Sequence, residues 1–165
     1  MENPHLVDIP EYEGLYKFDL ELNKVYNCKT NIYLKNSLNG KGYYDVCLSK
    51  NKIRNHFRVN RLVYICNNPT EDITEFQIDH KDGNRQNNNI HNLRKATSSE
   101  NCSNRKTPIT NRLGIKYISK TTTGYKFQLR KNKINYYKHF KNLEDAITYR
   151  DIKVREICGE FANLG

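Results

Sequence analysis

The sequence lacks any apolar run long enough to cross a membrane, and its first residues, MENPHLVDIPEYEG, lack the basic-then-apolar order of a signal peptide. It also lacks a CxxC pair. The five cysteines are far apart in the chain, and an odd number argues against a disulfide scaffold. We therefore expect free thiols in a reducing, intracellular compartment, with no membrane partner and no structural zinc.

Hydrophobic residues are scarce: they make up 36% of the 165 residues, and the mean hydropathy is −0.90. This composition favours small modules with thin cores over one large core. Aromatic residues reach 11%, which argues against a disordered chain. We expect an α+β protein of three modules: a β-rich module at 1–52, a central module at 53–106 and a β-sheet module at 107–165.

Acidic residues are absent from 103–141, a segment rich in Lys and Arg. The whole chain has a formal net charge of +10 and a pI near 9.4. Basic proteins of this size usually bind nucleic acid or an anionic surface. The charge therefore predicts a polyanionic partner, and 103–141 is the first place to look for its binding surface.

Short runs rich in Tyr, Val, Ile and Leu, split by Gly and Asn, predict strands and hairpins over 9–66. The run RLVYICNNP predicts a short helix that ends before Pro69. Residues 76–102 read as strand, long loop, strand and helix. Thr97 and Glu100 have the spacing of a capping box, which predicts that the helix begins there.

The last third predicts three strands, GIKYIS, YKFQLR and NYYKHF, followed by one helix in LEDAITYRDIKVREICG. Lys126, Gln128 and Arg130 alternate along the second run, so they share one face of the predicted sheet. We expect the opposite face to pack on the helix as core. The residues predicted for that core are Phe127, Leu129, Tyr137 and Phe140.

The stretch IDHKDGNRQNNNIHNL, residues 78–93, can fill almost none of a core, and it begins with an Asp-His pair. Asp79 supplies the hard anionic oxygen that Mg²⁺ or Mn²⁺ prefers. His80 can take a proton near neutral pH. Phosphodiester hydrolysis needs both a metal and a base, and Asn101, in the first turn of the next helix, can complete a metal shell.

A plainer interpretation exists for the same stretch. An Asp-His dipeptide is common, and an Asn-rich loop can be a solvated turn, because Asn tolerates left-handed backbone and bonds its own main chain. An AT-rich coding sequence would also raise the Asn content. That interpretation explains the composition of the stretch, but it does not explain the order of its residues.

The order resembles the HNH endonucleases of mobile introns and phages, over about 45 residues from FRVNRLVYIC to SSEN. That family reads roughly as HRLV, a spacer, (D/N)HxDG(N/D)xxNNxxxNL, then xxxT and xEN. The resemblance implies a ββα-metal finger with His80 as general base and Asp79 and Asn101 as ligands of Mg²⁺ or Mn²⁺. It also implies that Asn92 holds the loop and orients His80, while Gly83 and Asn84 shape the turn and Asn88 is structural.

One position departs from this pattern: Asn60 stands where the family usually has His. Arg61 follows it and is a candidate phosphate contact. Upstream, EYEGLYKFD is similar to the start of a short module that often precedes this type of HNH domain.

The C-terminal GIKYISKTTTGYKFQLR…GEFANLG resembles the AP2 DNA-binding domain over about 55 residues. The resemblance implies a three-stranded antiparallel sheet, packed on one helix, that lies in the major groove of double-stranded DNA. The candidate DNA contacts are Lys116, Tyr117, Lys120, Lys126, Gln128, Arg130, Lys138 and His139.

Together these features predict a site-specific DNA endonuclease of the homing type, a monomer that nicks one strand at a time. The alternative is a DNA-binding protein without catalysis, either a regulator or a decayed nuclease. Retention of Asp79, His80 and Asn101 together at family spacing favours catalysis.

Overall fold

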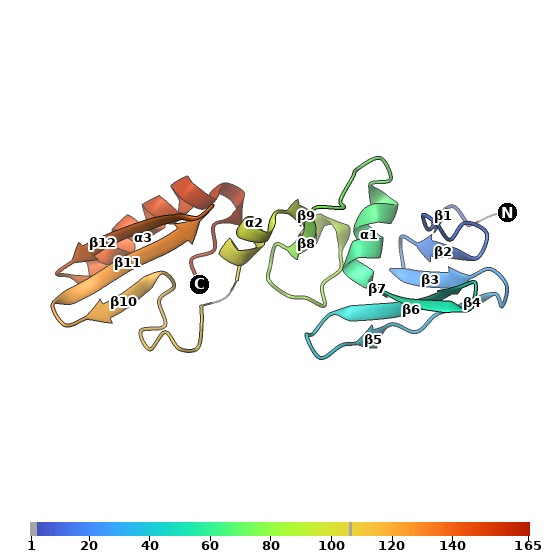
Figure 1. Cartoon of the computed structure of the whole chain (residues 1–165), viewed down its shortest axis with the longest axis horizontal. Coiled ribbons are helices and arrows are strands. Elements are labelled where there is room, and N and C mark those ends of the chain that lie inside the picture. Colours follow the sequence, from blue (N-terminus) through green and yellow to red (C-terminus); the bar gives the residue numbers. More distant parts are fainter. Residues whose placement is uncertain (1–2, 106) are drawn as a thin grey trace. The chain divides into compact units, whose positions relative to one another are not determined.

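The computed structural model describes residues 3–105 and 107–165 (Figure 1), and the chain forms two compact units, Met1–Lys95 and Ala96–Gly165. The module boundary predicted after residue 106 falls on a residue outside those described. The boundary predicted after residue 52 lies inside the first unit, because residues on both sides of it share one hydrophobic core. Among the described residues, no helix is long and apolar enough to span a membrane.

The first unit is built mainly from short antiparallel strands. One sheet has the order β1-β2-β3-β4, a second has the order β5-β6-β7, and β8 pairs with β9. The bounds are β1 Leu6–Asp8, β2 Tyr16–Asp19, β3 Lys24–Asn27, β4 Ile32–Tyr33, β5 Ser37–Leu38, β6 Tyr44–Lys50, β7 Ile53–Arg58, β8 Gln77–His80 and β9 Leu93–Ala96.

The β6–β7 hairpin turns through Asn51 and Lys52, whose φ angles are 53° and 64°. Positive φ at both central residues is the geometry of the two-residue turn that matches the twist of paired strands. The register places Asp45 opposite Arg58. The hairpin therefore delivers Arg58 to its open end, directly before the first helix.

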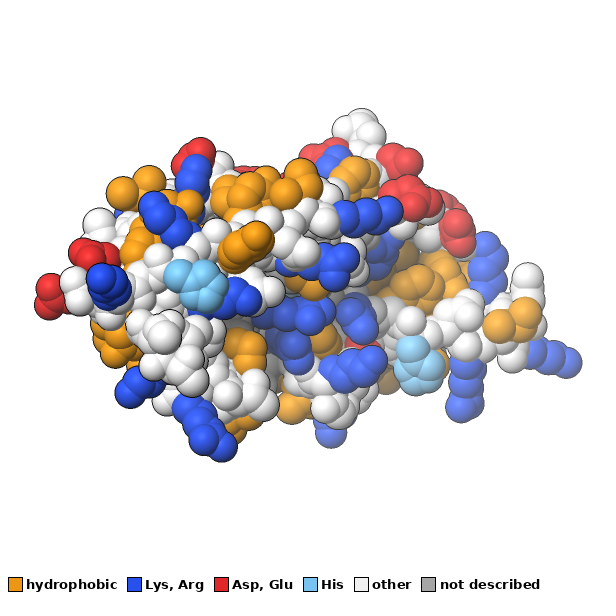
Figure 2. All heavy atoms as spheres, turned by 60° about the vertical axis from the view of Figure 1, so that its left-hand side comes forward, with side chains coloured by type: hydrophobic (Ala, Val, Ile, Leu, Met, Phe, Trp, Pro, Cys, Tyr) orange, Lys and Arg blue, Asp and Glu red, His pale blue; other side chains and the backbone are white. Residues whose placement is uncertain are grey.

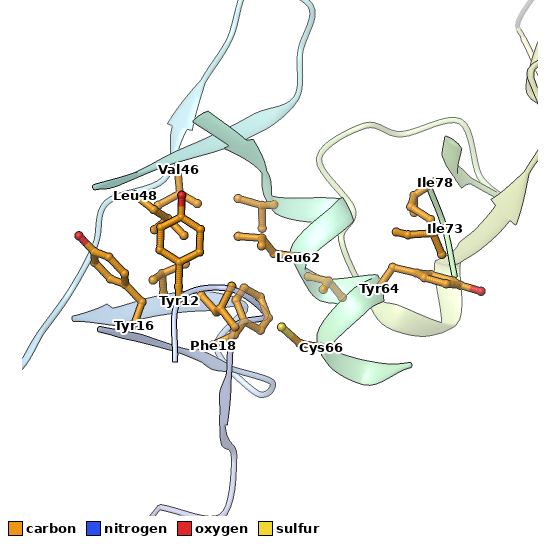
Figure 3. Close-up of a cluster of buried hydrophobic side chains, with 14 of the residues drawn as sticks. Tyr12, Tyr16, Phe18, Val46, Leu48, Leu62, Tyr64, Cys66, Ile73 and Ile78 are labelled. Atoms are coloured by element: carbon orange, nitrogen blue, oxygen red, sulfur yellow. The ribbon is translucent and has the colours of Figure 1, made fainter. Parts of the chain in front are cut away.

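Helix α1, Val59–Asn67, lies at the centre of the first unit, and it ends two residues before Pro69, as predicted. On one side it meets Phe18 and Leu48 from the sheets, and on the other side Tyr64 points toward Ile73 and Ile78 (Figure 3). Fully burying each such side chain contributes about 1.5–3 kcal/mol. Because Ile78 lies in β8, this packing fixes the strand that ends in Asp79 and His80.

The second unit contains a three-stranded antiparallel sheet with the order β10-β11-β12, and α3 packs on it (Figure 1). Its core is formed by Phe127, Leu129, Val154 and Cys158. The bounds are α2 Ser98–Ser103, β10 Ile118–Thr121, β11 Gly124–Lys131, β12 Ile134–Phe140 and α3 Leu143–Cys158, with single 3-10 turns at Ile90–Asn92 in the first unit and Gly159–Phe161 in the second.

The three strands and the helix lie where the sequence predicted them, with two differences. The first strand begins only at Ile118, because Tyr117 has a φ of 64° and bends the chain. The prediction that Tyr137 belongs to the core is wrong: Tyr137 is 69% exposed, and it pairs with Gln128 on the open face. Its neighbour Tyr136, which pairs with Leu129, packs against the core instead.

The cysteines Cys28, Cys47, Cys66, Cys102 and Cys158 are free thiols in the structure. Burial raises the pKa of the Cys66 thiol to about 12. That thiol therefore stays protonated at neutral pH and behaves as a small apolar side chain on the buried face of α1.

Candidate active site

Strand β8 is held against α1 by side chains that bond its backbone. Asn60 is buried, and its Nδ2 donates to the carbonyl oxygen of Ile78 at 3.1 Å, one residue before Asp79. Arg61 donates to the carbonyl oxygens of Ile73 and Phe76 at 2.8 and 3.0 Å. The guanidinium of Arg61 is thus occupied by the chain leading into β8, and we withdraw the prediction that it contacts phosphate.

His80 ends β8 and is 4% exposed. Its Nε2 lies 3.0 Å from Oδ1 of Asn88, which can only accept a hydrogen bond. In the neutral imidazole Nε2 therefore carries the proton, and the basic lone pair lies on Nδ1. Asn88 is the residue that selects this tautomer, a role beyond the purely structural one expected for it.

Asp79 is 5% exposed and forms an ion pair with Arg94 of β9, whose Nε donates to Oδ2 at 2.9 Å. The side chain of Arg94 is only 12% exposed. The pair links the two strands at the point where the loop closes, and it fixes the orientation of the Asp79 carboxylate.

Asn92 ties both ends of the loop that follows His80. Its Nδ2 donates to Asp82 Oδ1 and to the carbonyl oxygen of Asn87, at 3.0 and 2.8 Å, while its Oδ1 accepts from the backbone N–H of Asp82 at 3.1 Å. Its own carbonyl accepts from the N–H of Lys81 at 2.8 Å. The resemblance implies that Asn92 holds the loop and orients His80, and hydrogen bonds to both ends of the loop are what holding it requires.

Asp82 is the acceptor around which this loop is organised. It also accepts from the Asn84 backbone N–H at 2.8 Å and from Asn87 Nδ2 at 2.8 Å. Burial raises the pKa of Asp82, but the hydrogen bonds from Asn87, Asn84 and Asn92 outweigh it and hold the pKa below its usual value. The carboxylate is therefore charged at neutral pH and serves as a permanent acceptor.

The remaining asparagines of the loop bond the main chain two residues further on. Asn84 Oδ1 accepts from the N–H of Gln86, and Asn89 Oδ1 accepts from the N–H of His91, at 3.1 and 2.9 Å. Such bonds replace the strand ladder that a loop cannot make. The asparagine content of this loop thus has a structural cause, which is the satisfaction of backbone groups around the Asp79–His80 pair.

The donor set suits a hard cation. Within the described residues, no group of three or more His, Cys, Asp and Glu side chains is placed to hold a metal ion. The buried carboxylate of Asp79 is a ligand type that Mg²⁺ or Mn²⁺ prefers, and these ions take part of their coordination from water and phosphate oxygens. Asn101, the second predicted ligand, lies on α2 in the second unit.

Helix α2 begins as the sequence predicted. The Thr97 side chain accepts from the N–H of Glu100 at 3.3 Å, and the Glu100 carboxylate accepts from the N–H of Thr97 at 2.8 Å. This reciprocal capping box fixes the start of the helix, and with it the position of Asn101 along the chain.

The predicted DNA-contact residues fall into two groups in the second unit. Lys126, Gln128 and Arg130 share one face of β11, and the register adds His139 and Tyr137 of β12 to that face. Lys138 pairs with Phe127, so it lies on the helix side, where its Nζ stands over the Tyr149 ring at 4.5 Å. Lys120 is exposed but pairs with Tyr125, which also places it away from the Lys126 face.

Lys116 is not on the surface, so we withdraw it from the DNA-contact set. It is 4% exposed, its Nζ donates to the carbonyl oxygen of Ser103 at 2.8 Å, and it stands over the Tyr117 ring. The Tyr117 hydroxyl donates to the same carbonyl at 3.0 Å, so Tyr117 also points inward. The bend at Tyr117 turns both side chains away from the sheet face.

The buried Lys116 predicts a pH dependence of stability. Burial lowers the pKa of Lys116 to about 8, whereas the unfolded chain keeps the ordinary value of about 10.4. Between pH 8 and about 9.5 the unfolded state binds more protons, so the free energy of unfolding of the full chain should rise, by up to about 1.4 kcal/mol per pH unit. Denaturant unfolding across this range measures it. Lys116→Met should flatten the slope, and an equal slope in that variant would contradict the assignment.

Sequence reasoning missed Asp82 and Arg94, and it gave Asn88 only a structural role. The Asp-Gly turn carried a signal for Asp82, because a crowd of amide donors needs an anionic acceptor. For Arg94 and Asn88 the local pattern carried no signal, since their contacts to Asp79 and His80 depend on how β8, β9 and the loop close in space.

Comparison with known proteins agrees with the HNH resemblance. Residues 58–102 match the family described as HNH endonuclease. The chain is 37% identical over 99 residues to the DNA endonuclease I-HmuI of Bacillus phage SP01. This match covers 59% of this chain and 55% of that protein. It is 34% identical over 137 residues to the uncharacterized HNH endonuclease L245 of Acanthamoeba polyphaga mimivirus, covering 81% of this chain and 37% of the relative.

A solved structure extends this similarity to the fold. It is titled "DNA binding and cleavage by the HNH homing endonuclease I-HmuI", and it superposes with a TM-score of 0.54 and 35% identity over 60% of this chain and 56% of that chain. The chain thus spans about half the length of I-HmuI and about a third of L245. The segment that carries Asp79, His80, Asn92 and Asn101 is the one that matches the HNH endonuclease family.

Proposed function

We propose that this chain is an HNH-type DNA endonuclease of the homing kind, which hydrolyses one phosphodiester bond at a time as a monomer. The observation that carries the proposal is the pair formed by Asp79 and His80. A buried carboxylate and a buried imidazole, the latter bonded to Asn88, are consecutive residues at the end of β8, inside the segment that matches the HNH endonuclease family.

His80 acts as general base. Its Nδ1 takes a proton from the attacking water, the water oxygen bonds to phosphorus, and the bond from phosphorus to the leaving oxygen breaks. The leaving oxygen then takes a proton from solvent. Asn88 accepts from Nε2–H throughout, so the imidazolium that forms keeps its orientation.

Asp79 would hold the divalent cation, with Asn101 as the second protein ligand that the sequence resemblance implies. When bound, Mg²⁺ or Mn²⁺ supplies neutralisation of the charge that develops on the phosphate. The Arg94 Nε donates to Asp79 Oδ2, and this ion pair fixes the orientation of the carboxylate. Asn92 and Asp82 keep the loop closed behind His80.

The second unit would supply DNA affinity. Its open sheet face carries Lys126, Gln128 and Arg130. A major groove can admit a two- or three-stranded sheet surface of this kind. A groove of about 920 Å³ in the same unit is lined by charged residues such as Arg105 and Arg112 together with apolar ones such as Leu113 and Ile118. Lys and Arg side chains appear at many places on the surface drawn in Figure 2, and the net charge of +10 suits a polyanionic partner.

A cleavage assay tests this function. The full chain is incubated with pooled genomic DNA at low salt, with Mg²⁺, with Mn²⁺ or with a chelator, and new ends are mapped by sequencing. We expect breaks at a recurring site, on one strand, that the chelator abolishes. Binding at a preferred site without any cutting would instead support a non-catalytic DNA-binding protein.

The sheet-face assignment predicts an affinity change. Lys126→Ala/Arg130→Ala should weaken binding to a duplex carrying the mapped site by about 1–3 kcal/mol, or about fivefold to 150-fold in Kd. Fluorescence anisotropy in the presence of chelator measures it. Lys138→Ala/Arg155→Ala removes the same charge from the helix side and should change Kd far less. Equal losses for the two double variants would show that net charge alone governs binding.

A further inference from the structure

Tyr43 contacts the ring of His80, and no role assigned above uses it. It lies in the turn between β5 and β6, and its ring centroid is 5.9 Å from that of His80, at an interplanar angle of 48°. The aromatic ring is thus a direct neighbour of the candidate general base, contributed by a hairpin outside the segment that matches the HNH endonuclease family.

The turn that carries Tyr43 is closed by hydrogen bonds. Asn39 Oδ1 accepts from the N–H groups of Lys41 and Tyr43 at 2.9 and 3.1 Å, and the Asn39 N–H donates to the Tyr43 carbonyl at 2.8 Å. Asn39 Nδ2 also donates to Asp45 Oδ2 at 2.8 Å. Gly42, with a φ of 80°, makes the tight return possible. The backbone of Tyr43 is therefore fixed by the hairpin.

Two guanidinium groups stand against the same ring. The Arg58 Cζ is 4.5 Å and the Arg85 Cζ is 5.0 Å from the Tyr43 centroid. Arg58 ends β7, and Arg85 belongs to the loop that follows His80. Arg85 is further held by Nη1, which donates to the Lys41 carbonyl at 2.7 Å. Three separate segments of the first unit thus bring two cations and one ring together beside His80.

Within the part of the chain that the structure describes, neither guanidinium forms an ion pair with a carboxylate. Both side chains are exposed, and their like charges repel one another. Stacking on Tyr43 offsets part of that repulsion. A bound anion would offset the rest, and the planar fork of Arg matches phosphate oxygens.

We propose that Tyr43 is a platform that sets Arg58 and Arg85 beside His80 so that the two guanidiniums bind the phosphate that is cut. This inference rests on the proposed endonuclease function and names two further catalytic residues and one positioning residue for it. The guanidiniums stabilise the negative charge that develops on the phosphate as water attacks. Arg58 comes from the end of the β6–β7 hairpin, and Arg85 comes from the loop that follows His80.

The alternative for these arginines is general attraction of the DNA backbone, and Arg54 provides the matched control. It is exposed and lies on the same face of β7 as Arg58, but further along the hairpin, opposite Ser49. A backbone contact should affect affinity, whereas a contact to the reacting phosphate should affect the rate at saturating DNA.

The test has two measurements. The first is the rate of single-turnover cleavage of a duplex carrying the mapped site, at saturating enzyme. The second is the Kd for the same duplex in the presence of chelator. We expect Arg58→Ala and Arg85→Ala each to slow cleavage by about 10²–10³-fold, with Kd within about threefold of wild type. Arg54→Ala should leave the rate within about threefold. Added guanidinium ion at millimolar concentration should restore part of the rate in the two Arg→Ala variants, which a purely structural defect would not allow.

Tyr43→Leu should lower the rate about tenfold or more and should weaken the effect of a second Arg58→Ala change, because the ring acts only through the arginines. If an alanine variant fails to fold, Arg58→Lys and Arg85→Lys take its place, since they keep the charge and remove the planar fork. If the wild type cuts DNA and the arginine variants cut it at the same rate, this inference is overturned and the proposed function stands. A wild type that never cuts, with any metal, would overturn the proposed function and this inference with it.

Discussion

Replacing His80 with alanine should abolish nearly all cleavage while leaving DNA binding intact. The imidazole is the only group beside Asp79 on β8 that can accept a proton near neutral pH, and a positioned general base contributes about 10²–10⁴-fold to a rate. We expect a loss of that size in single-turnover cleavage of a duplex with the mapped site. Kd measured in chelator should stay within about threefold of wild type.

His91 offers a control from the same loop. Its side chain is exposed, and only its backbone takes part in the hydrogen bonds of the loop. His91→Ala should therefore cut at the wild-type rate. A His80→Ala variant that still cuts within tenfold of wild type would remove His80 from the role of general base, whatever its effect on folding.

Removing Asp79 should have two separable effects, one on cleavage and one on folding. Asp79→Ala deletes the carboxylate proposed to hold the cation, so cleavage should be lost with Mg²⁺ and with Mn²⁺. It also leaves the largely buried Arg94 without this carboxylate. Breaking one side of a buried ion pair costs about 3–5 kcal/mol, and this loss should appear in the free energy of unfolding of the full chain.

The double variant Asp79→Ala/Arg94→Met separates these effects. It removes both charges and keeps much of the volume of the arginine stem, so most of the folding loss should be recovered. Cleavage should remain absent, because the carboxylate is still missing. If the stabilised double variant cut DNA at the wild-type rate, Asp79 would have only a structural role.

Local patterns predicted much of the candidate site. The capping box of α2, the end of α1 before Pro69 and the loop between β8 and β9 each depend on a few neighbouring residues, so they could be read from the sequence. The HNH pattern likewise follows a fixed order along the chain, and the family match over 58–102 agrees with it.

What failed depended on long-range packing or on strand register. In NYYKHF both Tyr136 and Tyr137 could have faced the helix, and a shift of one residue exchanges the two faces of a strand. Tyr137, predicted for the core, lies on the open face, and Lys138, predicted as a DNA contact, pairs with Phe127 on the helix side. The burial of Lys116 could not be predicted either, because it follows from the positive φ of Tyr117.

The loop behind His80 has a practical consequence for solution conditions. It is held mainly by amide groups and backbone, with Asp82 as its charged acceptor, and amide hydrogen bonds are little affected by dissolved ions. Contacts to DNA phosphates weaken steeply as ionic strength rises. If the chain binds DNA as proposed, raising the potassium chloride concentration should release it from DNA while the loop behind His80 keeps its shape. Ionic strength can then serve as a reversible switch between the bound and the free protein during purification.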